Sequence, residues 1–89
     1  MKKKFEFEFE DCSSENTIKF DFDDEMDEDM KVVIENNTSV IYANKDAYLV
    51  LAKALIKMAL CEYSPGFHFH LRQNFDADQE DAIRFHLID

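Results

Sequence analysis

The stretch Gly66-Phe67-His68-Phe69-His70-Leu71-Arg72 alternates apolar and polar side chains with a period of two. That period is typical of a strand with one buried face. Residues 83–88 alternate in the same way, so we expect the two segments to pair as strands. Their polar face would then carry all three histidines of the chain, which are His68, His70 and His86.

Four earlier segments also have strand patterns. Residues 4–10 alternate Phe with Glu, and residues 17–23 repeat the pattern of alternating apolar and charged residues. This predicts an antiparallel hairpin with one solvent-exposed face and one buried face. Residues 31–35 and 39–42 are short β-branched runs on either side of Asn36-Asn37. Two asparagines suit the positive φ angles of a tight hairpin turn.

Between these segments and the histidine strands lies one predicted helix. Asn44 can cap it, residues 47–62 are rich in good helix formers, and Ser64-Pro65-Gly66 ends it. Leu51, Leu55 and Met58 form an apolar stripe along it, and further apolar positions widen that arc to Leu49, Ile56 and Leu60. We therefore expect a well-buried helix, with its lysines mostly away from the stripe.

The predicted order is β-β-β-β-α-β-β within one domain, residues 1–89. Hairpins around a single helix favour an α+β fold with two layers. We expect an antiparallel sheet of about six strands, covered on one face by the helix. A chain of this length holds only one modest core.

The chain is strongly acidic, with a net charge of −10 and 12 acidic residues against four lysines in residues 1–30. Residues 23–29 form an acidic run broken only by Met26, which predicts a solvated loop. The electrostatic field of this negative charge repels nucleic acid and anionic membranes, and it speeds association with a basic protein. The alternative is that the charge only keeps the protein soluble.

The basic start of the chain, residues 1–4, is followed by Phe/Glu alternation rather than an apolar run, so we expect no signal peptide. No segment approaches the ~20 apolar residues needed to span a bilayer. Cys12 and Cys61 lie in unlike segments and predict free thiols. We expect a cytoplasmic protein.

The histidines are the strongest candidates for site chemistry. His68 and His70 would have Cβ atoms about 7 Å apart, with His86 about 5 Å away on the next strand. Three imidazoles can bind zinc or a similar metal, although strand alternation places any such pair this way. The chain has no phosphate loop and no nucleophile elbow, and its cysteines have no evident base. We therefore expect no enzyme activity and no cofactor.

Three short motifs in the second half of the chain form one recognisable pattern. They are Asn44-Lys45-Asp46, the helix residues Leu51-Ala52 and 55–59, and Gly66-Phe67-His68-Phe69-His70-Leu71. On these motifs, residues 44–89 resemble the immunity protein 32 family of bacterial polymorphic toxin systems. Arg72, where the family tends to carry an acid, and His86 in the final strand depart from that pattern. The resemblance implies a small cytoplasmic antitoxin that binds one cognate toxin domain stoichiometrically and blocks it.

Tight binding of a toxin domain, which we expect to be basic, would need aromatic or arginine anchors as well as charge. The candidate contact residues are His68, His70, Arg72, Tyr63, Phe75, Asp24, Glu25 and Asp27, with Tyr42 as a further aromatic. The aromatic residues have core packing as their alternative role. Exposed sheet edges allow either a monomer or a homodimer. The competing functions are a metal-binding module or small metal-dependent enzyme built on the histidines, and an acidic mimic of nucleic acid.

Overall fold

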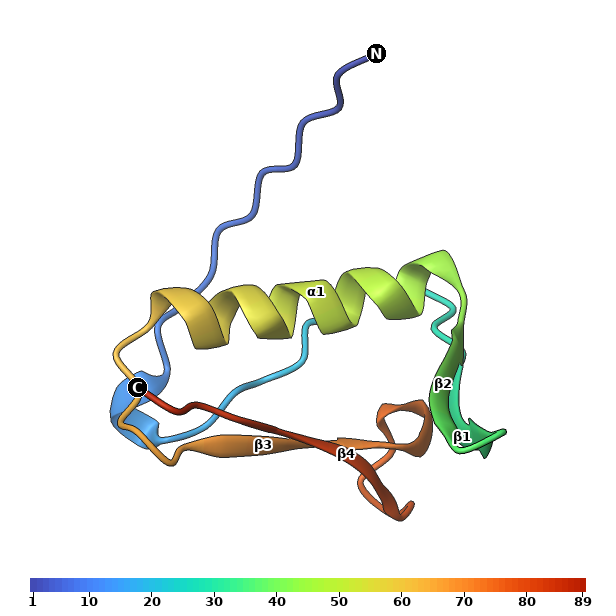
Figure 1. The fold of residues 1–89 in the computed structure, drawn as a ribbon. Helices are drawn as coiled ribbons and strands as arrows, with labels where there is room; N and C mark the ends of the chain where they lie inside the picture. Colours follow the sequence, from blue (N-terminus) through green and yellow to red (C-terminus); the bar gives the residue numbers. More distant parts are fainter.

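A 16-residue helix, α1 (Lys45–Leu60), lies across two antiparallel hairpins in the computed structural model, which describes residues 1–89 (Figure 1). β3 (His68–Arg72) and β4 (Asp81–His86) lie below the helix, whereas β1 (Met30–Glu35) and β2 (Thr38–Ala43) stand at its N-terminal end. Two short 3-10 turns, η1 (Ser13–Glu15) and η2 (Gln73–Phe75), complete the elements. The fold is therefore α+β, with one helix and two two-stranded sheets.

The helix starts where the sequence predicts. The side chain of Asn44 accepts a hydrogen bond from the Ala47 N–H at 2.9 Å, and Asp46 lies in the first turn. The helix ends at Leu60, because Cys61 takes an extended conformation while its N–H still bonds to Lys57 O.

The β3–β4 hairpin follows the predicted pairing. His68 lies opposite His86 and Phe69 opposite Phe85, with an irregularity between Leu71 and Arg72. Two further backbone hydrogen bonds, Leu87 N to Phe67 O and Gly66 N to Leu87 O, continue the ladder to the turn after α1. Gly66 has a φ of 90°, which favours glycine there.

The β1–β2 hairpin turns at Asn36 and Asn37, whose φ angles of 51° and 65° confirm the predicted tight turn. Its outer edge is held by side chains rather than by another strand. The amide of Gln73 accepts from Val32 N at 2.8 Å and donates to Val32 O at 2.9 Å, as a neighbouring strand would. The side chain of Asn74 likewise accepts from Met30 N.

The core lies between α1 and the two hairpins. Leu71 of β3 is fully buried and packs with Met30, Ala47 and Leu51. A second cluster contains Ala54, Met58, Tyr63, Phe67 and Phe69. Phe20 and Phe85 contact both clusters and join them into a continuous core.

The prediction of about six strands in one sheet is not confirmed. Residues 4–10 and 17–23 are extended but belong to no ladder. One physical reason is visible at Lys57, whose Nζ bonds to the Lys19 carbonyl at 2.8 Å. This bond joins residues 17–23 to α1 rather than to residues 4–10.

The helix is also less covered than predicted. Its buried face carries Ala47, Val50, Leu51, Ala54, Lys57 and Met58. Leu49 is 41% exposed and Leu60 is 69% exposed, and Ala52 and Ala59 are exposed as well. The apolar arc thus continues onto a face of α1 that no strand covers.

Candidate functional site

β3 and β4 bring the three histidines together, as their alternation predicts. The His68 and His86 rings are stacked, with centroids 4.7 Å apart and planes at 22°. The His70 ring lies 5.1 Å from that of His68 in an edge arrangement. His68 and His86 are exposed, whereas the neighbouring Phe69 and Leu71 are buried, so the imidazoles form part of an outer surface.

Asp81 links this cluster to Arg72. Its carboxylate lies 2.8 Å from His70 Nδ1 and 3.2 Å from Arg72 Nη1, and Arg72 also donates to the Gln79 carbonyl. The His70 contact has the distance of an ion pair but lacks hydrogen-bond alignment, so it attracts only when the imidazole is protonated. All three side chains are more than one-third exposed, which keeps these pairs weak.

The stacked imidazoles do not form a metal site as they stand. No group of three or more His, Cys, Asp or Glu side chains is arranged to hold a metal ion. Binding through His68, His70 and His86 would require the stacked rings to turn.

Two of the predicted contact residues pack inward, Tyr63 within the core and Phe75, half-buried, against it. Tyr63 is buried, stacks on Phe67 at 4.1 Å, and donates from its hydroxyl to Thr17 O at 2.6 Å. Burial raises the pKa of its phenol above the ordinary value, and the nearby Cys61 thiol adds to that shift. Phe75 packs edge-on against Phe20 and Phe22. Tyr63 and Phe75 therefore both take part in packing, the alternative role that the sequence left open.

Tyr42 remains on the surface of β2. Its hydroxyl donates to Glu35 at 2.7 Å, which raises the pKa of the phenol, and Lys31 lies over its ring. Cys12 and Cys61 are free thiols.

The acidic run at residues 23–29 is exposed, yet its backbone is held. Asp27 N–H donates to the Asp46 carboxylate at 3.0 Å, and Asp29 N–H donates to the Asn44 side chain at 3.2 Å. The Asn44 amide in turn donates to Asp27 O. Since these contacts come from the N-terminus of α1, the carboxylates of Asp24, Glu25 and Asp27 project from an anchored loop.

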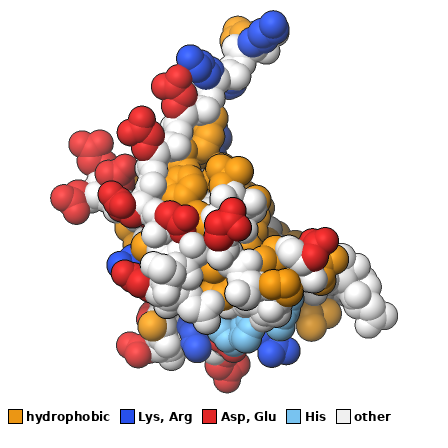
Figure 2. Space-filling model, turned by 90° about the vertical axis from the view of Figure 1, so that its left-hand side faces the viewer, with side chains coloured by type: hydrophobic (Ala, Val, Ile, Leu, Met, Phe, Trp, Pro, Cys, Tyr) orange, Lys and Arg blue, Asp and Glu red, His pale blue; other side chains and the backbone are white.

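Figure 2 shows how charge is distributed on one side of the molecule. Carboxylates gather along the N-terminal segment and its surroundings, whereas the histidines lie at the opposite end with basic side chains beside them. The surface therefore offers two different chemistries, one strongly acidic and one of imidazole with a few charges of both signs.

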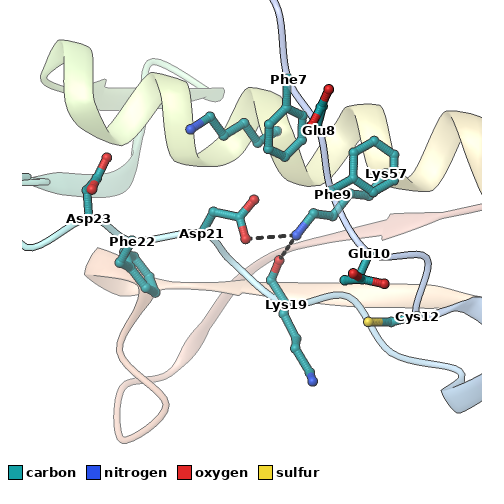
Figure 3. Close-up of a pocket in the computed structure, with 11 residues that line it drawn as sticks. Phe7, Glu8, Phe9, Glu10, Cys12, Lys19, Asp21, Phe22, Asp23 and Lys57 are labelled. Carbon is teal, nitrogen blue, oxygen red and sulfur yellow. Dashed lines mark hydrogen bonds and ion pairs between the residues drawn. The ribbon is translucent and has the colours of Figure 1, made fainter.

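A cleft of about 480 Å³ lies between residues 7–12, residues 19–23 and α1 (Figure 3). Lys57 forms its floor and is only 7% exposed. Its ammonium donates to Lys19 O and to Asp21 Oδ1 at 3.0 Å, and the rings of Phe7 and Phe9 lie 5.9 and 6.0 Å away. Lys53 lies 5.1 Å from the Phe7 ring.

Sequence reasoning missed Lys57 by assigning it to the outer face of the helix. The signal was its spacing, since Ala47, Val50, Ala54 and Lys57 recur at three- and four-residue intervals along one face. The ammonium already has a carboxylate and a carbonyl as partners, so its role is to hold residues 19–21 against α1.

No helix of the structure combines the length and apolarity that crossing a membrane requires. Neither a protein-family model, nor a curated protein, nor a solved structure matches the chain.

Proposed function

We propose that this chain is a non-enzymatic immunity protein of the cytoplasm, which binds a cognate toxin domain and occludes it. The observation that carries the proposal is the anchored acidic loop. Six of the seven residues at 23–29 are acidic, and the side chains of Asn44 and Asp46 hold the loop backbone at Asp27 and Asp29, accepting from their N–H groups, while Asn44 also donates to Asp27 O.

An anchored charged loop suits recognition of a basic partner. Complementary charge steers the encounter, and a preordered loop loses less conformational entropy on binding than a free one. The resemblance of residues 44–89 to immunity protein 32 names the kind of partner. A toxin domain that attacks nucleic acid carries basic surface, which fits the net charge of −10.

The direct test is protection from a toxin. The C-terminal domain of a polymorphic toxin encoded beside this chain should stop growth of a bacterial host, and co-expression of this chain should restore growth. The two purified proteins should form a stoichiometric complex. Failure to protect, together with failure to bind, overturns the proposal.

The loop is tested by a neutral triple variant, Asp24→Asn with Glu25→Gln and Asp27→Asn. We expect association with the toxin domain to slow about tenfold at low salt, because steering charge is lost. The matched control is Asp78→Asn with Glu80→Gln and Asp89→Asn, which removes the same charge from exposed positions elsewhere. Equal slowing by both variants would mean that net charge acts and the loop does not.

The metal-binding function remains a second candidate because the three imidazole rings are neighbours. If zinc binds there, saturating zinc should raise the melting temperature by linkage, and His68→Ala should remove the rise. No shift with zinc would eliminate this candidate and leave the immunity proposal untouched.

A further inference from the structure

The N-terminal segment, residues 1–10, is extended and pairs with no strand (Figure 1). We call it the arm. It leaves the molecule beyond α1 on the side away from β3–β4, and its backbone forms no hydrogen bonds. Phe5 is 52% exposed, and only Phe7 and Phe9 reach α1. An unpaired strand with an apolar face is a template for pairing with another strand.

The charges of the arm are complementary to those of a second, antiparallel copy. With Phe5 opposite Phe5, Lys4 faces Glu6 and Lys2 faces Glu8, and the two-fold repeat gives four opposite-charge pairs on the polar face. Lys3 faces Phe7 on the other face.

Other registers are penalised. A shift of two residues places either Glu6 opposite Glu6 or Lys4 opposite Lys4. A parallel pairing would bring like charges side by side along the whole arm. The register with Glu6 opposite Glu6 still faces lysines with glutamates on either side, but its one like-charge pair destabilises it, so the register with Phe5 opposite Phe5 is favoured.

The uncovered face of α1 supplies the second observation. Two strands alone are marginal in water and need an apolar surface to pack on. Leu49 and Leu60, with Ala52 and Ala59 between them, form an exposed apolar surface on the helix. The ring of Phe7 already lies beside this helix, over Lys53.

From these observations we propose that the chain forms a homodimer, in which the arms of two copies pair as antiparallel strands with Phe5 at the two-fold axis. The paired arms lie with their Phe face toward the outer surfaces of the two α1 helices. The partner of this surface is thus a second copy, and the proposal does not depend on the toxin-binding function.

Sedimentation of the full chain over a range of concentrations tests this dimer through charge reversal. Lys2→Glu with Lys4→Glu makes every facing pair like-charged, and Glu6→Lys with Glu8→Lys does the same with the opposite sign. We expect each variant to weaken self-association at least about tenfold. An equimolar mixture of the two restores opposite charges at every pair and should dimerise as tightly as the natural chain.

The two variants distinguish an effect of strand pairing on self-association from an effect of net charge. Glu6→Lys with Glu8→Lys makes the chain less negative, so general repulsion alone would predict stronger association, whereas the register predicts weaker association. All four positions are exposed on the arm, and circular dichroism should show an unchanged fold. A natural chain that stays monomeric, a dimer insensitive to both variants, or a mixture that fails to associate would overturn the proposal.

Discussion

Residues 67–71 and residues 5–9 alternate aromatic or aliphatic side chains with polar ones in the same way, yet they have different structures. The first stretch lies in β3 and its ladder, with Phe69 stacked on Phe85 at 5.0 Å and α1 above it. The second is an extended arm without a ladder, in which Phe7 stacks on Phe9 at 5.1 Å and the ammonium groups of Lys53 and Lys57 lie over these rings. Alternation therefore decides which side chains share a face, whereas the hydrogen-bonding partner decides whether a sheet forms.

The largest expected difference between the two regions is in stability. Leu71→Ala should lower the free energy of unfolding by about 2–5 kcal/mol, because it leaves a cavity at a fully buried site. Phe5→Ala should change it by less than about 0.5 kcal/mol in the monomer, because the ring is half exposed. Urea denaturation measures both, and equal losses would show that the arm belongs to the core.

The next effect concerns Asn44, which caps α1 and anchors the acidic loop at residues 27–29. Asn44→Ala should cost about 1–2 kcal/mol, because Ala47 N–H and Asp29 N–H both lose an acceptor. Asn44→Asp is the matched control: it keeps the acceptor for both N–H groups and loses only the donor to Asp27 O, so it should retain part of this stability. Thermal unfolding compares the two, and an Asn44→Ala variant as stable as the natural chain would contradict the anchoring.

A smaller effect is expected at Tyr63, whose hydroxyl holds Thr17 of the extended segment 17–23 against the core. Tyr63→Phe removes the hydrogen bond to Thr17 O and should cost about 1 kcal/mol at neutral pH. Urea denaturation at several pH values measures this cost, with Tyr48→Phe as the control, which removes a hydrogen bond to Ile41 O at an exposed tyrosine.

The cost at Tyr63 should depend on pH in one direction. Because burial raises the pKa of the folded phenol, the folded state binds its proton more tightly than the unfolded chain. This contribution is complete below about pH 10, the ordinary tyrosine pKa, and is lost as the pH rises above it. The natural chain should therefore converge on the Tyr63→Phe variant at alkaline pH, and a constant difference would show that the phenol does not titrate differently on folding.

The elements that could be predicted from sequence are those with local determinants. Asn44, Asn36 and Asn37 fix a cap and a turn through their own side chains or backbone preferences. The predicted ends of the helix and of the β1–β2 hairpin therefore all lie within two residues of the observed ends. The facing pair His68 and His86 followed from strand alternation alone.

The failures involve contacts between distant segments. The Lys57 ammonium bonds to Lys19 O and Asp21, 38 and 36 residues away, and no local pattern marks such a partner. For Tyr63 and Phe75 the sequence left both contact with a partner and core packing open, because exposure of an aromatic residue depends on what packs over it. The same reasoning explains the acidic loop: its composition predicted exposure correctly but could not reveal the anchoring by Asn44 and Asp46.

The most direct test of this contrast is amide hydrogen exchange on the Lys2→Glu, Lys4→Glu variant, in which arm pairing between copies is suppressed. The account predicts slow exchange at Phe69 and Leu71 in β3 and exchange near the unprotected rate for residues 4–10. Strong protection of residues 4–10 in this variant would contradict it, because it would mean that the arm pairs with residues 17–23 of its own chain.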